Sequence, residues 1–245
     1  RSAGTLPPGT PVSVESGINT RSIAIDPSGR FAYAANRGVA ADTGPDTVSI
    51  YVIDQVTGAL TPGTPPNAAA GDQPVSAAVH PSGKFAYTAN YGDDTVSIYT
   101  INRSTGALAP ATPATATVGD RPHCIAFHPS GKFAYVANAG SGSVSIFTVN
   151  RKTGALTPGS PASVDAGNFT ISVAVDPSGA FIYAANRDSS SISAYTIDPD
   201  SGALTPAGSD AATGSRPLSV AVDPSGKFVY AANQDSNTVS AYAID

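Results

Sequence analysis

One motif recurs five times along the chain and limits the possible fold more than any other feature. Pro-Ser-Gly begins at Pro27, Pro81, Pro129, Pro177 and Pro224, so successive copies are 54, 48, 48 and 47 residues apart. A period of about 40–50 residues indicates a repeat architecture in which each copy is one supersecondary unit. The longer first spacing predicts a loop insertion over residues 39–44.

Two further motifs follow the same period. A Tyr-x-x-Asn motif begins at Tyr33, Tyr87, Tyr135, Tyr183 and Tyr230. A Val/Ile-Ser-x-aromatic motif begins at Val48, Val96, Val144, Ile192 and Val239. Because every copy carries these residues, we interpret them as scaffold, and we look for function where the copies differ.

Each copy is predicted to form four strands. In the last copy, strands are expected over residues 218–222, 228–232 and 238–244, because they are rich in β-branched and aromatic residues and are separated by turn residues. A short outer strand is expected to begin at residue 203 in the fourth copy. The third strand is apolar on both faces, so each sheet must stack between two others. The predicted fold is an all-β, five-bladed β-propeller with four-stranded antiparallel blades.

The N-terminus is predicted to close the ring. Residues 1–8 match residues 103–110, which precede and begin the outer strand of another copy, whereas the last copy ends at Asp245 before its own outer strand. The N-terminal strand is therefore expected to complete the last blade and to remove open sheet edges. We expect one domain over 1–245, with blades near 18–70, 71–118, 119–166, 167–213, and 214–245 plus 1–17. A linear solenoid and a longer chain with more blades are the alternatives.

Composition narrows the choice of partners. The formal net charge is −5 and there is no basic block, which argues against nucleic acid. No apolar run approaches the roughly 18 residues of a membrane span, so no membrane insertion is expected. The single cysteine, Cys124, excludes an internal disulfide and is expected to be buried. We find no metal or phosphate-loop motif and expect no metal, no cofactor and a monomer.

The histidines differ in their expected roles. His80 and His128 precede Pro-Ser-Gly, where the other copies have Asp, and are predicted to stabilise that turn. His123 instead begins the first strand of the third copy, near the mouth of the axial channel, and breaks the symmetry there. It is a candidate general base or anion contact. The alternative is an ordinary surface histidine.

Arginines are predicted to gather at the same end of the blades. The candidate ligand-binding residues are Arg21, Arg37, Tyr91, Arg121, Arg187, Arg216 and Gln234, all in loops or strand ends at the channel mouth. Arginines that converge there would suit a carboxylate, a phosphate or a sugar acid. The alternative is that they serve only solubility.

The repeated motifs resemble a known family. The stretches over residues 128–138, 143–147 and 153–158 (HPSGKFAYVAN, SVSIF and TGALTP) are similar to lactonase-type propellers, which include 6-phosphogluconolactonase-like and carboxymuconate-cyclising enzymes. They also resemble surface-layer propellers with Tyr-Val-Thr-Asn repeats, and the resemblance covers the whole chain. It implies a propeller, usually of seven blades, with catalytic histidine, glutamate and arginine on the channel face. This chain has five copies and one glutamate, Glu15, placed in or near an outer strand.

Three functions follow as hypotheses, and the sequence favours the first, in which the protein is not an enzyme. The first is a non-catalytic binding or scaffolding propeller whose variable loops contact a small anionic ligand, a glycan or a protein. The second is a lactone hydrolase of the 6-phosphogluconolactonase-like type, with His123 as base. The third is a structural surface protein or an engineered ring. The resemblance to surface proteins, with the low lysine content, favours an extracytoplasmic or cell-surface location.

Overall fold

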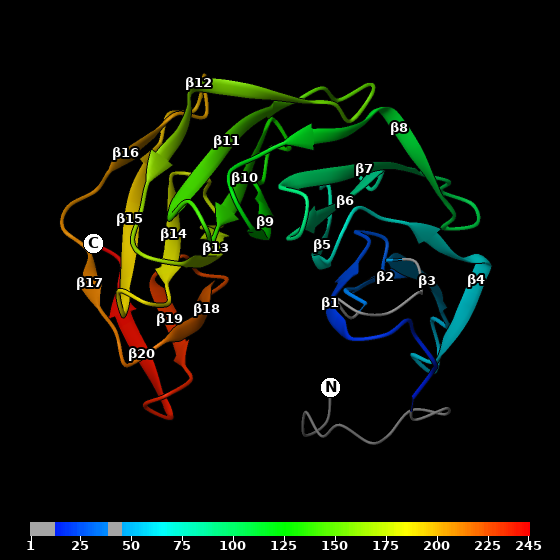
Figure 1. The fold of residues 1–245 in the computed structure, drawn as a ribbon, viewed down its shortest axis with the longest axis horizontal. Coiled ribbons are helices and arrows are strands. Elements are labelled where there is room, and N and C mark those ends of the chain that lie inside the picture. The colour runs from blue at the N-terminus through cyan, green and yellow to red at the C-terminus, as the bar shows by residue number, and fades with distance from the viewer. Residues whose placement is uncertain (1–12, 39–45) are drawn as a thin grey trace.

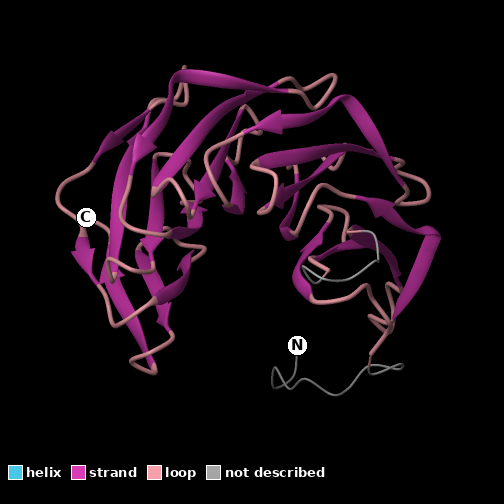
Figure 2. Cartoon of the chain, viewed as in Figure 1, coloured by secondary structure: helices cyan, strands magenta, loops and turns pink. Residues whose placement is uncertain are grey.

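Five antiparallel β-sheets form an arc in the computed structural model, which describes residues 13–38 and 46–245 (Figure 1). Every element in these ranges is a strand, joined by loops and turns (Figure 2). No helix long and apolar enough to cross a membrane occurs in them.

Each sheet is one blade, numbered here in chain order. Blade 1 has β1 (Thr20–Ile25), β2 (Phe31–Asn36), β3 (Thr47–Ile53) and β4 (Leu60–Ala69). Blade 2 has β5 (Pro74–Val79), β6 (Phe85–Asn90), β7 (Thr95–Ile101) and β8 (Leu108–Thr117). Blade 3 has β9 (Pro122–Phe127), β10 (Phe133–Asn138), β11 (Ser143–Val149) and β12 (Leu156–Asp165). Blade 4 has β13 (Thr170–Val175), β14 (Phe181–Asn186), β15 (Ser191–Ile197), β16 (Leu204–Pro206) and β17 (Ala211–Ala212), and blade 5 has β18 (Pro217–Val222), β19 (Phe228–Asn233) and β20 (Thr238–Ala243).

The strands of each blade pair antiparallel in chain order, which confirms the predicted blade. The first strands β1, β5, β9, β13 and β18 line the inner side of the arc (Figure 1). The short outer strand expected in the fourth copy is confirmed by β16, which has 3 residues, whereas β4, β8 and β12 have 10 residues each. A register shift in the pairing with the third strand lets these outer strands continue past the proline-rich stretch (for example between Ser145 and Phe147). The insertion expected over 39–44 lies outside the described residues.

Recurrent tyrosines join neighbouring blades. Tyr135 on β10 is fully buried, and its hydroxyl donates a hydrogen bond to the Gly202 carbonyl of the next blade at 3.1 Å. Tyr33 and Tyr87 make the same bond to Gly106 and Gly154. The ring fills the space between two sheets while the hydroxyl satisfies a buried carbonyl, so this repeat residue supplies both packing and register.

The recurrent asparagines join the second and third strands within a blade. Asn186 is fully buried, and its Nδ2 donates to the hydroxyls of Ser191 and Ser193 at 3.2 and 2.8 Å. All five copies make this pair of bonds. The scaffold role predicted for these asparagines follows from this bonding, because a buried amide must be hydrogen-bonded.

The Pro-Ser-Gly turn is stabilised by the residue before it, as predicted. Asp26 accepts hydrogen bonds from the backbone N–H groups of Ser28, Arg30 and Phe31. His80 accepts the Ser82 N–H at Nδ1, and its Nε2 contacts the Gly131 carbonyl of the next blade at 2.8 Å. The histidine therefore links two blades as well as closing its own turn.

His80 should make stability depend on pH. Burial lowers the pKa of His80, as the charge of Arg151 also does, although the Gly131 carbonyl partly opposes them. The folded state therefore binds a proton less readily than the unfolded chain, and stability falls as pH drops below the unfolded value of about 6.5. We expect the Tm to fall between pH 7.5 and 5, by roughly 2–4 °C for each kcal/mol lost, and His80→Gln to remove part of that fall. Thermal unfolding of both proteins across this range tests it; an equal fall in the variant would contradict the assignment.

The ring is not closed in the described residues. Blades 1 and 5 lie at the two ends of an open arc (Figure 1). On blade 1, Ile23 and Ile25 are 57% and 60% exposed. In blade 3, Ile125, which is equivalent to Ile23, is only 7% exposed. On blade 5, Phe228 and Tyr230 are 44% and 41% exposed, although most of their counterparts are buried. The predicted closed five-bladed ring is therefore not confirmed, and the predicted closing strand falls on residues 1–12, outside the described residues.

Candidate functional site

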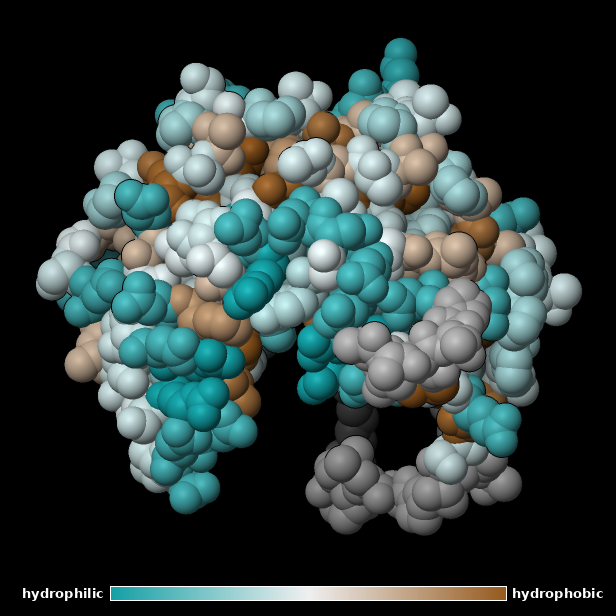
Figure 3. All heavy atoms as spheres, in the orientation of Figure 1, coloured by the Kyte–Doolittle hydropathy of each residue, from teal (hydrophilic) through white to brown (hydrophobic). Residues whose placement is uncertain are grey.

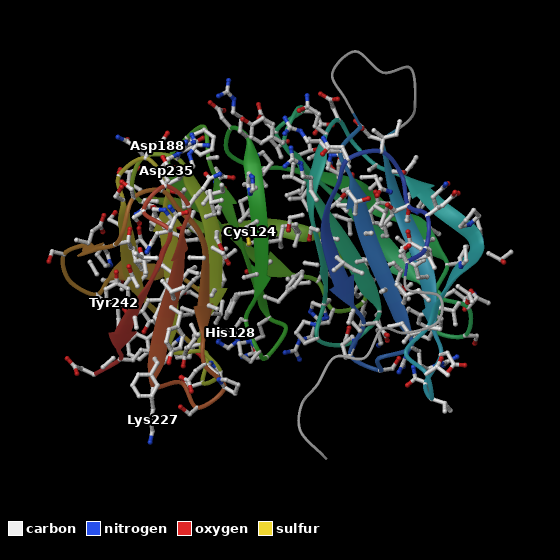
Figure 4. The ribbon with its side chains drawn as sticks, turned by 90° about the horizontal axis from the view of Figure 1, so that it is seen from below. Cys124, His128, Asp188, Lys227, Asp235 and Tyr242 are labelled. Atoms are coloured by element: carbon white, nitrogen blue, oxygen red, sulfur yellow. The ribbon has the colours of Figure 1, made fainter. Side chains whose placement is uncertain are left out.

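The two ends of the blades carry different groups. Asp188 and Asp235 lie at one end of the strands, and His128 and Lys227 lie at the opposite end (Figure 4). The loops that hold the predicted site residues belong to the first end. Hydrophilic side chains gather along the inner border of the arc (Figure 3). The sequence prediction of one variable, polar face is consistent with this arrangement.

Arg121, two residues before His123, and the equivalent residue of every other repeat have a positive φ angle. Asn19, Gln73, Arg121, Phe169 and Arg216 occupy this position, with φ between 53° and 57°. Non-glycine residues adopt this left-handed region uncommonly, at a cost of order 1 kcal/mol each. All five copies keep this strained conformation, although the side chain at the position varies between copies. The position is therefore a candidate for a functional role.

The clearest side-chain cluster surrounds Tyr91 in blades 1 to 3. The Arg37 guanidinium lies 5.1 Å from the Tyr91 ring centre, and that of Arg121 lies 5.9 Å away. His123 meets the same ring edge-on at 6.3 Å. Gln73 Oε1 accepts hydrogen bonds from Arg37 Nε and Nη2 at 3.0 and 2.6 Å. The structure thus brings together four predicted site residues from three blades, with Gln73 orienting one of them.

Among the described residues, no carboxylate forms an ion pair with the arginine side chains of this cluster, although Asp94 accepts the backbone N–H of Arg121. Arg37 is held by the neutral amide of Gln73, and neither Arg21, Arg37 nor Arg121 forms an ion pair within the described residues. Two cations beside one aromatic ring favour an anionic ligand.

His123 is uncharged at neutral pH. The pKa of His123 is lowered to about 4, chiefly by burial of the ring and also by the nearby charges of Arg21 and Arg37, while the backbone of Ile171 partly opposes this change. A neutral imidazole can accept a proton from a bound water, and an anion on the arginines would make it more basic.

Of the four remaining predicted residues, Arg21 is exposed and forms no ion pair among the described residues, and Arg187 and Arg216 belong to two separate pairs. Arg187 stacks on the Phe169 ring at 3.5 Å and donates to both carboxylate oxygens of Asp188 at 2.7 and 3.0 Å. Arg216 lies 3.5 Å from Asp235, and its carbonyl accepts the backbone N–H of Gln234. These arginines are neutralised by carboxylates, so they are less available to an anion than Arg37 and Arg121.

Four site residues were not predicted from the sequence. Gln73, Phe169, Asp188 and Asp235 each contact a predicted arginine. Gln73 and Phe169 occupy the same repeat position as Arg121, so aligning the five copies at that position could have found both. Asp188 directly follows Arg187, which is the only signal it offers. The single glutamate is not part of this cluster: the carbonyl of Glu15 accepts a hydrogen bond from Tyr51.

Comparison with known proteins decides the family. Residues 5–111 and 62–245 match the family model described as lactonase, 7-bladed beta-propeller. The chain belongs to this lactonase family. A comparison with curated proteins gave no match. Membership supports the second hypothesis, lactone hydrolysis, better than the binding or scaffolding propeller that the sequence favoured.

Solved structures share the lactonase fold. The periplasmic gluconolactonase PpgL of Pseudomonas aeruginosa has a TM-score of 0.75 and 23% identity, over 91% of this chain and 66% of that one. A 6-phosphogluconolactonase-like protein of Bacteroides fragilis has a TM-score of 0.65 and 20% identity, over 95% and 82%. Hydrazine synthase of Kuenenia stuttgartiensis has a TM-score of 0.52 and 19% identity, over 92% and 83%. The chain therefore spans 66% of the length of the Pseudomonas protein, and these likenesses concern the fold alone.

Proposed function

We propose that this lactonase-family chain hydrolyses a lactone that carries an anionic group, at the channel-mouth cluster around Tyr91. The observation that carries the proposal is that neutral His123, Arg37 and Arg121 all lie against the Tyr91 ring, and that neither guanidinium forms an ion pair among the described residues. A base and an anion site side by side are what hydrolysis of an acidic sugar lactone requires.

The chemistry uses only these residues and water. His123 takes a proton from a water molecule as the water oxygen bonds to the lactone carbonyl carbon. Arg121 and Arg37 hold the substrate anion and stabilise the negative charge that develops on the carbonyl oxygen. The ring C–O bond then breaks and the proton passes to the leaving oxygen, which yields an open-chain hydroxy acid.

We propose that the five sheets close into one ring around this mouth. A closed mouth would surround the ligand, and the exposed faces of blades 1 and 5 are of the kind that blades elsewhere bury against each other. The ligand is a small anion, and no metal or cofactor enters the proposed step. We also propose an extracytoplasmic location, as for the periplasmic Pseudomonas protein, and a monomer.

A lactone panel tests the function. We expect turnover of phosphorylated or carboxylated sugar lactones above the spontaneous rate, and weaker turnover of the uncharged lactone. Arg37→Ala should raise KM for the anionic substrate by roughly 10-fold or more, since one charge-assisted hydrogen bond contributes about 1.5–3 kcal/mol. Rates by pH-indicator assay, with the uncharged lactone as control, check this; no turnover on any member of the panel would refute the proposal.

A further inference from the structure

One aromatic position distinguishes blade 3 from the other four blades. Blades 1, 2, 4 and 5 carry a tyrosine there on the third strand, and its hydroxyl donates a hydrogen bond to a backbone carbonyl shortly before the first strand of the same blade. These tyrosines are Tyr51, Tyr99, Tyr195 and Tyr242. Blade 3 has Phe147 at this position, and no side chain of the described residues donates to the equivalent carbonyl, that of Thr117.

A cavity of about 370 Å³ lies where the missing hydroxyl would reach. Thr117 at the end of β8 and Phe147 on β11 both line it, together with residues of β12. β8 and β12 lie on the outer side of the arc, away from the first strands (Figure 1). The equivalent space in blade 4, beside Tyr195, measures about 110 Å³. The larger space therefore accompanies the replacement of tyrosine by phenylalanine.

Two buried serines of β11 give the cavity unused hydrogen-bond donors. Ser143 and Ser145 line it and are only 7% and 5% exposed. Their hydroxyl oxygens accept bonds from Asn138 Nδ2 at 3.1 and 2.9 Å, but neither hydroxyl donates to any described residue. In blade 4 the equivalent Ser191 does donate, to the Asp210 carboxylate at 3.2 Å. Because buried polar groups are nearly always hydrogen-bonded, the two free donors of blade 3 favour a ligand that brings acceptors.

The rim of the cavity supplies acceptors and an apolar wall. The Asp165 side chain lines the cavity and forms no ion pair among the described residues, and the Thr117 carbonyl lies nearby. Phe147 and Pro158 provide carbon surface. The described lining includes no lysine, arginine or histidine, so a carboxylate without a cation would repel an anionic ligand. A neutral molecule with several hydroxyls, each able to donate and to accept, matches this set of groups.

We propose that the blade 3 cavity binds a neutral sugar residue. The sugar hydroxyls accept hydrogen bonds from Ser143 and Ser145 and donate to the Asp165 carboxylate and the Thr117 carbonyl. One face of the sugar ring packs on the apolar wall. No residue of the cluster around Tyr91 takes part, so this site is separate from the proposed hydrolysis of an anionic lactone and does not depend on it.

Phe147→Tyr tests the site with the residue that the other four blades already carry. Its hydroxyl should bond to the Thr117 carbonyl and enter the cavity, so the Tm should be equal to or above that of the parent protein. The dissociation constant for the best-bound probe should rise by roughly 10-fold or more, since a ligand acceptor is lost. The probes are the methyl glycosides of glucose, galactose and mannose, followed by saturation-transfer NMR and titration calorimetry. Unchanged binding in the variant, or no binding of any probe to the parent, would overturn the proposal.

Ala162→Trp tests the site by filling it. Ala162 is an exposed residue of β12 that lines the cavity, and a tryptophan there should abolish binding of the same glycosides. Ala114→Trp is the matched control, because Ala114 is the equivalent exposed residue of β8 and does not line the cavity. Equal binding by the two variants would contradict the assignment. Lactone turnover should be the same in all three variants, so loss of glycoside binding with turnover intact supports this site, and absence of turnover in the parent refutes only the proposed hydrolysis.

Discussion

His123→Ala is expected to lower kcat for hydrolysis of the anionic lactone by roughly 10²–10⁴-fold, the usual contribution of a positioned general base. KM should change little, because Arg37 and Arg121 rather than His123 hold the substrate anion. Steady-state rates with the best substrate of the panel measure both constants. The matched control is His128→Ala, at the opposite end of the blades (Figure 4), which should keep its turnover while it remains folded. Full activity in His123→Ala would remove the base from the proposed mechanism.

The pH dependence of kcat/KM and kcat distinguishes a role of His123 as general base from a purely structural role. Burial, together with the charges of Arg21 and Arg37, lowers the pKa of His123 to about 4. The active form is the neutral imidazole, so kcat/KM should rise with pH through about 4 and be level by pH 6. A bound anion offsets the arginine charges, so the rise in kcat should occur at higher pH than the rise in kcat/KM. A rise of kcat/KM near 6.5, the ordinary histidine value, would contradict the assignment.

Tyr135→Ala is expected to have the largest effect on stability, lowering the free energy of unfolding by about 3–5 kcal/mol. The ring is fully buried between blades 3 and 4, and its hydroxyl bonds to Gly202. Tyr135→Phe keeps the ring but leaves the buried carbonyl of Gly202 without its partner, and should cost about 1–3 kcal/mol. Urea unfolding with comparison of the slopes measures both. Equal losses in the two variants would mean that the hydrogen bond, and not the packing, dominates this contact.

The repeat made most of the fold predictable. Five copies of Pro-Ser-Gly and Tyr-x-x-Asn located the turns and the second strands, since these residues act through local hydrogen bonds and backbone preferences that recur in each copy. The short outer strand of the fourth copy was predicted, but the 10-residue outer strands of blades 1 to 3 were not, because the register shift beside Ser145 is not visible in the sequence.

The sequence predicted where on the blades the candidate site lies, but it did not predict the individual side-chain contacts in that site. Placing His123 and the arginines at one end needed only the strand order within the repeat. That Gln73 orients Arg37, and that Asp188 neutralises Arg187, depends on side-chain directions and on which blades are adjacent.

By itself, the sequence determined the blade, its strand order and the face that varies between copies, because these follow from short-range patterns repeated five times. Only the tertiary structure decided which arginines form no ion pair among the described residues, how far the pKa of His123 falls, and that the described blades form an open arc. The physical reason is that desolvation, charge pairing and the angle between neighbouring blades depend on contacts between residues about 50 positions apart, on different blades, which the pattern of a single copy does not specify.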